Sequence, residues 1–112
     1  MNKFLIILTI TLPLFGCSKS VPNCSDSLVT DLVKQIADRE MANQMGIDFA
    51  KLFTYKVEAI RTTNTHEKTG AHDCAAELTL IKNKEVHNKL PITYTVEKTD
   101  KSDEIYVNVF GL

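Results

Sequence analysis

The sequence contains no tryptophan, few aromatic residues (7%) and no long block of one charge. Its 13 basic and 14 acidic side chains nearly balance over 112 residues. A nucleic-acid-binding domain usually carries a basic stripe with aromatic side chains beside it, and a polybasic membrane helix carries clustered lysines. Neither pattern is present, so we expect no nucleic-acid partner and no polybasic membrane contact.

Catalytic motifs are also missing. No serine lies in a Gly-x-Ser-x-Gly sequence, and there is no P-loop, no dinucleotide-binding glycine pattern and no His-Glu-x-x-His motif. We therefore predict that the protein is not an enzyme and uses no cofactor or metal ion. The alternative is a weak zinc site, in a small enzyme or metal carrier, which would form if the loop with His66 and Glu67 folded back toward His72 and Asp73.

A long apolar run lies at the N-terminus. It follows Lys3, covers residues 4–15 and ends in Leu14-Phe15-Gly16-Cys17. The run has the length of a signal peptide and is too short to cross a bilayer as a permanent helix. The last four residues resemble the lipobox of bacterial lipoproteins, which implies diacylglyceryl transfer to the Cys17 sulfur and cleavage after Gly16. The alternative is an ordinary secretory signal with an incidental cysteine.

The lipobox resemblance divides the chain into a signal peptide (residues 1–16), a lipidated tether (17–23) and one small periplasmic domain (24–112). Two or three acyl chains hold a protein stably on a bilayer, whereas one chain gives marginal binding. In enterobacteria-like sorting, an Asp directly after the lipidated cysteine retains the protein at the inner membrane, but here that residue is Ser18. The resemblance therefore implies an envelope protein anchored to the outer membrane and facing the periplasm.

The sequence has three cysteines, and lipid should block Cys17. The other two, Cys24 and Cys74, would lie in an oxidising compartment, where a pair of thiols usually forms a disulfide. We therefore predict a Cys24–Cys74 disulfide. The alternative is a metal site that uses Cys74 with His72 or Asp73.

Hydrophobic periodicity predicts one helix in the first half of the domain. From Ser25 or Ser27 to Gly46, apolar residues recur at helical spacing and polar residues occupy the opposite side. This pattern indicates an amphipathic helix with one face to bury. The apolar set is Leu28, Val29, Leu32, Val33, Ile36, Ala37 and Met41.

After residue 52 the hydrophobic period changes to two, which is typical of half-buried strands. Alternating runs separated by polar segments predict a four-stranded antiparallel meander. The predicted fold class is therefore α+β, with an N-terminal amphipathic helix packed on this sheet. The architecture resembles cystatin-like and NTF2-like folds. The inward residues are Phe53, Tyr55, Val57 and Ala59, then Cys74, Ala76, Leu78 and Leu80, then Leu90, Ile92, Tyr94 and Val96, and finally Ile105, Val107 and Val109.

The last of these runs is apolar on both sides, because Tyr106, Phe110 and Leu112 oppose its inward stripe. We expect that either residues 47–53 cover this second stripe or a partner binds it. Together with Ile60, which falls on the outward side of the first strand, these three residues form the predicted interaction surface. The simpler interpretation is a water-facing sheet whose threonines reflect strand propensity.

Several segments are similar to those of small lipoproteins of Gram-negative bacteria. With an anchor, a disulfide and no catalytic motif, we predict a non-catalytic binding or inhibitory module that acts on a protein partner in the envelope. Toxin immunity and the exclusion of phage or plasmids belong to this class. The alternative is an accessory structural lipoprotein of a secretion or conjugation complex, docking through its last strand. The segments are Ile60-Arg61-Thr62-Thr63, Thr69-Gly70-Ala71, Cys74-Ala75-Ala76-Glu77-Leu78, Pro91-Ile92-Thr93-Tyr94 and Tyr106-Val107-Asn108-Val109.

Overall fold

The structure is a computed structural model that describes residues 20–101 and 103–112. The expected signal peptide and Cys17 lie outside the described residues. Within the described residues, no helix is long and apolar enough to span a bilayer. The elements are α2 (Ser27–Met45), α3 (Ile47–Ala50), β1 (Phe53–Thr65), β2 (His72–Lys82), β3 (Glu85–Lys98) and β4 (Ile105–Phe110).

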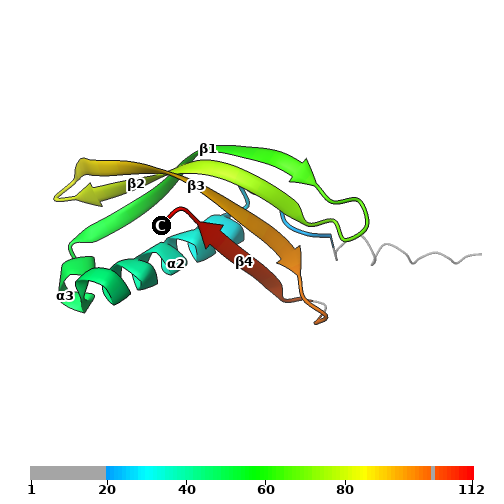
Figure 1. Ribbon diagram of the computed structural model, residues 1–112, viewed down its shortest axis with the longest axis horizontal. Coiled ribbons are helices and arrows are strands. Elements are labelled where there is room, and N and C mark those ends of the chain that lie inside the picture. The colour runs from blue at the N-terminus through cyan, green and yellow to red at the C-terminus, as the bar shows by residue number, and fades with distance from the viewer. Residues whose placement is uncertain (1–19, 102) are drawn as a thin grey trace, which may run out of the picture.

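The four strands form one antiparallel sheet in the order β1-β2-β3-β4. The sheet curves over α2, which runs along one of its faces (Figure 1). The predicted α+β class, the packed helix and the meander are therefore confirmed. The helix was expected to be N-terminal, and this is wrong: it begins at Ser27, after a segment that the Cys24–Cys74 disulfide joins to the start of β2.

Helix α2 begins and ends at residues that satisfy its free backbone groups. The Asp26 carboxylate accepts a hydrogen bond from the Leu28 N–H, and Gly46 ends the helix with a φ of 96° that favours glycine. Val29, Val33 and Ala37 are buried at a spacing of four residues. Leu28, which the apolar pattern places on the same face, is exposed, whereas Leu32 and Ile36, one and two turns farther along the same row, pack against the core cluster.

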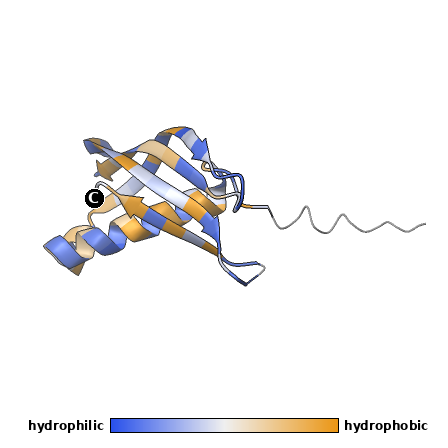
Figure 2. Cartoon of the chain, turned by 45° about the vertical axis from the view of Figure 1, so that its right-hand side comes forward, coloured by the Kyte–Doolittle hydropathy of each residue, from blue (hydrophilic) through white to orange (hydrophobic). Residues whose placement is uncertain are grey.

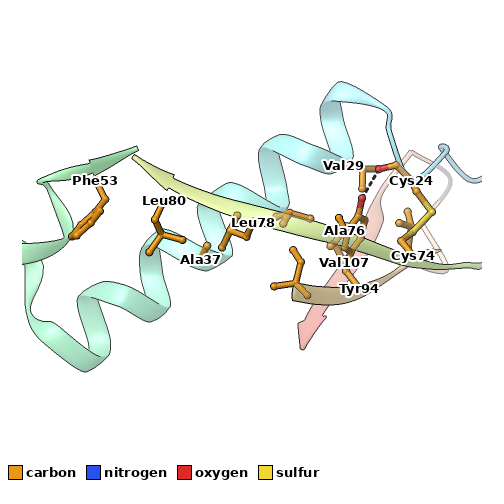
Figure 3. Packing of buried hydrophobic residues seen from close by; sticks show 13 residues of the cluster. Cys24, Val29, Ala37, Phe53, Cys74, Ala76, Leu78, Leu80, Tyr94 and Val107 are labelled. Atoms are coloured by element: carbon orange, nitrogen blue, oxygen red, sulfur yellow. Dashed lines mark hydrogen bonds between the residues drawn. A yellow bond between two sulfur atoms is a disulfide. The ribbon is translucent and has the colours of Figure 1, made fainter. Parts of the chain in front are cut away.

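The core lies between this helical stripe and the inward residues of the central strands. Figure 3 shows Val29 and Ala37 facing Ala76, Leu78 and Tyr94 across one continuous layer. In Figure 2, hydrophobic residues (orange) are interspersed with white and blue residues along the strands. The core is small, so covalent links matter more to the stability of this domain than they would in a larger one.

The predicted Cys24–Cys74 disulfide is confirmed. Its sulfur atoms are 2.06 Å apart, and both cysteines are buried. The Tyr94 hydroxyl donates a 2.8 Å hydrogen bond to the Cys24 carbonyl oxygen, and the Thr62 hydroxyl lies 3.3 Å from the Cys24 sulfur. Val21 packs against the core cluster. The chain is therefore attached to the domain from Val21 onward, before the expected end of the tether at residue 23.

A β-bulge in β1 changes which side chains point inward. Ala59 has a φ of 53°, and the register with β2 shifts between Glu58 and Arg61. The extra residue reverses the alternation after this point. The expectation that Ala59 points inward and Ile60 outward is therefore wrong: Ala59 is exposed, whereas Ile60 packs against the core.

Candidate interaction surface

The face of the sheet that points away from α2 carries the candidate site. Because Tyr94 and Val96 point into the core, Thr93, Thr95 and Glu97 point outward. The register pairs these three residues with Phe110, Asn108 and Tyr106 of β4, so both aromatic side chains lie on the outward face. We call it the outer face.

The two aromatic residues of β4 are open to solvent. Tyr106 is 54% exposed and Phe110 is 51% exposed, whereas Val107 of the same strand is buried. Helix α3 lies at the far end of α2 and does not cover them (Figure 1). Of the two expectations for this stripe, coverage by residues 47–53 is therefore excluded, and the stripe is accessible to a partner.

Phe110 borders a shallow hollow of about 350 Å³ on the outer face. Arg61, Ala75, Pro91 and Thr93 form the rest of its outward lining. Aromatic residues and arginine are enriched in the cores of protein interfaces and among the residues that contribute most to binding. We define the outer patch as these five residues together with Tyr106.

Arg61 is the charged member of the outer patch, and it was absent from the predicted interaction surface. Without the bulge, Arg61 would share the inward parity of Tyr55 and Val57. The bulge turns it outward, opposite Ala75 of β2. Within the described part of the chain, Arg61 forms no ion pair. The bulge depends on the positive φ of Ala59. Glycine usually marks such a position in a sequence and alanine does not, so the bulge could not be predicted.

In the rest of the outer face, toward the turn between β2 and β3, polar and charged side chains contact one another. Thr79 is buried there and donates a 2.6 Å hydrogen bond to the Glu58 carboxylate. The Lys89 ammonium lies 3.8 Å from the Glu77 carboxylate. Glu58 and Glu77, which the register places directly opposite each other, therefore each have a partner of their own. Both carboxylates of this part are thus engaged within the domain, whereas Arg61 forms no ion pair among the described residues.

Leu112 does not lie with Tyr106 and Phe110. Gly111 has a φ of 102°, and this turn takes Leu112 to the helix side of the sheet, where it borders a groove of about 90 Å³. The other apolar residues of the groove are Ala37, Met41, Leu78, Leu80 and Leu90.

The Tyr55 side chain also borders this groove. Its hydroxyl oxygen is buried, and the Asp38 carboxylate is the charged group that interacts with it. Burial raises the Tyr55 pKa above its ordinary value, and the negative charge of Asp38 raises it further. The surroundings of Tyr55 therefore disfavour a negative charge on its hydroxyl group.

The histidines expected to form the alternative metal site are held in separate contacts. The His66 Nε2 atom lies 3.1 Å from the Asp73 carboxylate, and the His72 Nδ1 atom lies 3.0 Å from the Thr65 hydroxyl. Cys74 is in the disulfide and is not free to bind a metal. Across residues 20–101 and 103–112, no group of three His, Cys, Asp or Glu side chains is arranged to hold a metal ion.

Comparison of the chain with protein-family models, with curated proteins and with solved structures gave no match. Its function must therefore be inferred from the chemistry of its own residues.

Proposed function

We propose that this protein is a lipoprotein of the bacterial cell envelope, anchored through Cys17 at the outer membrane and facing the periplasm, whose domain binds another protein without catalysing a reaction. The domain would be a variant of the cystatin-like or NTF2-like architecture. Inhibition, toxin immunity and the exclusion of phage or plasmids are the roles that fit such a molecule. The observation that carries the proposal is the outer patch on a disulfide-linked sheet.

The outer patch has the physical properties of a recognition surface. Two half-exposed aromatic rings provide apolar area, and Arg61 provides a cation with no internal carboxylate partner among the described residues. A sheet bound to its helix by a disulfide loses little freedom on binding, which leaves more of the contact energy for affinity. We therefore expect a partner surface with apolar side chains around an Asp or Glu that pairs with Arg61.

Affinity capture from cells tests this proposal. The tagged full-length protein is crosslinked in growing cells, and the captured proteins are identified by mass spectrometry. The Phe110→Ser and Arg61→Ala variants should lose the dominant partner. The matched control is Val86→Ser, since Val86 is an equally exposed apolar residue on a different part of the sheet, at 59%. A partner that is lost with Val86→Ser and retained with Phe110→Ser would contradict the proposal.

The second candidate is an accessory structural lipoprotein of a secretion or conjugation complex. One observation favours it: β4 is an edge strand of six residues that pairs with β3 without a register shift, and it contains neither proline nor lysine. Such an edge can accept a further strand from another protein. The opposite edge, β1, carries two register shifts and is less suitable. Deletion of the gene should then destabilise one specific envelope complex.

A further inference from the structure

The chain enters the domain at a fixed place. The Cys24–Cys74 disulfide joins the segment before α2 to the start of β2. Upstream, Val21 packs against the core cluster, and its Cγ2 atom would lie 3.4 Å from a Cβ atom added to Gly70. Gly70 belongs to the loop between β1 and β2 (residues 66–71), where its N–H donates a 2.7 Å hydrogen bond to the His66 carbonyl oxygen. Val21 is therefore held beside this loop.

The distance from Val21 to the lipid attachment site is limited by covalent geometry. Only residues 18–20 lie between Cys17 and Val21. Since an extended chain advances by at most about 3.6 Å per residue, the two Cα atoms are separated by no more than about 14 Å. A lipid on Cys17 would keep the loop between β1 and β2 close to the membrane surface.

We propose that the anchored domain is mounted on the bilayer by this end, with the loop between β1 and β2 nearest the lipid headgroups and α3 farthest from them. The inference rests on the proposed lipidation of Cys17. Helix α2 begins at the anchored end and has 19 residues, so its far end lies about 28 Å farther along the molecule. The turn between β2 and β3 lies at the same far end as α3 (Figure 1).

The charges at the anchored end do not themselves draw it to an anionic membrane. The loop carries Glu67 and Lys68. The turn between β3 and β4, at the same end of the molecule (Figure 1), carries Asp100, Lys101, Asp103 and Glu104, so acidic residues outnumber basic ones in these two segments. Lysine and arginine clusters, rather than acidic side chains, attract proteins to anionic lipid. The short covalent link and the docked Val21 thus set the orientation. One consequence is that a large soluble partner reaches the outer patch or the far end of the domain, not this loop.

Energy transfer from tryptophan to dansyl-labelled lipid headgroups tests the orientation. The chain has no tryptophan of its own, so each single substitution reports one position. Lys68→Trp marks the anchored end and Glu85→Trp marks the far end, and Lys101→Trp with Lys51→Trp form a second pair should one of the first two variants fail to fold. The full-length lipidated protein is reconstituted in vesicles, with the unlipidated Cys17→Ser protein as the control.

We expect transfer to be several-fold stronger from Lys68→Trp than from Glu85→Trp, and absent in the Cys17→Ser background. Insertion of a flexible Gly/Ser linker of about ten residues between Lys19 and Ser20 should weaken transfer from Lys68→Trp. Equal transfer from both ends of the vesicle-bound protein, or stronger transfer from Glu85→Trp, would overturn the orientation and leave the anchor intact. Failure of the Cys17 protein to bind vesicles would instead refute the anchor, and the orientation with it.

Discussion

Removal of the Cys24–Cys74 disulfide should lower the stability of this domain by a large and calculable amount. The bond joins residues 50 positions apart. The bond closes a loop of this length in the unfolded chain and lowers its entropy, which stabilises the folded state by about 4 kcal/mol. Small domains of this size lose about 4–8 °C of melting temperature for each kcal/mol. The Cys24→Ala/Cys74→Ala protein should therefore melt about 15–30 °C below the oxidised protein.

Urea and thermal unfolding of the unlipidated Cys17→Ser chain measure this change. The chemically reduced protein is the matched control, because it breaks the same bond without changing either side chain. We expect the reduced protein and the double alanine variant to lose similar free energies of unfolding. A loss of unfolding free energy below about 1 kcal/mol in both proteins would refute the reasoning, since it would mean that the bond hardly restricts the unfolded chain.

The location of the change is also predicted. Cys24 accepts the Tyr94 hydrogen bond through its carbonyl oxygen, and α2 begins three residues later at Ser27. Without the disulfide, backbone amides in the first turn of α2 should exchange with solvent faster relative to amides in the centre of β2. Hydrogen exchange followed by mass spectrometry measures both regions in one experiment. Equal acceleration throughout the chain would contradict a local role for the bond at the helix start.

Three further substitutions test other parts of the account, each by urea unfolding. Gly111→Ala should cost about 1–3 kcal/mol, because the new Cβ atom would lie 2.9 Å from the Pro91 carbonyl oxygen at a φ of 102°; the control Gly46→Ala, with a φ of 96° and no atom within 4 Å, should cost less. Ala59→Gly should stabilise the domain by up to about 1 kcal/mol, because glycine adopts a left-handed backbone without strain; a loss of stability would contradict strain at the bulge. Tyr94→Phe should cost about 1–2 kcal/mol through the unpaired Cys24 carbonyl group. Burial raises the Tyr94 pKa above its ordinary value of 10.0, so the folded state retains this proton more tightly than the unfolded state does. The stability from this source is complete below pH 10 and is lost as the pH rises through the folded pKa, and Tyr94→Phe should reduce that loss.

Periodicity was sufficient to predict the main elements from the sequence. The change from a helical period to a period of two after Leu52 located the helix and the sheet, and the two cysteines left after Cys17 identified the disulfide. These features depend on local patterns and on cysteine number, which a sequence displays directly. The strands extend farther into the polar segments than the alternation indicates: β2 begins at His72 and β3 at Glu85, because hairpin pairing orders residues that have no apolar stripe.

The composition of the outer patch was only partly predictable. Tyr106 and Phe110 were identified from the second apolar stripe of their strand, and the structure places both on the outer face. Because of the bulge at Ala59, Ile60 points inward and Arg61 points outward, the reverse of the alternating pattern. The position of the bulge depends on how β1 pairs with β2 and not on the sequence of either strand alone. Leu112 is separated from the aromatic pair by the turn at Gly111, where an added Cβ atom would lie 2.9 Å from the Pro91 carbonyl oxygen.

Site-specific photocrosslinking in living cells tests the binding role of the outer patch most directly. A photoreactive phenylalanine analogue is placed at Tyr106 in one strain and at Val86 in another, and both residues are about equally exposed, at 54% and 59%. We expect illumination to give a discrete adduct with one envelope protein from position 106 and none from position 86. An adduct that forms at position 86 but not at position 106, in a membrane-bound protein, would contradict recognition through the outer patch.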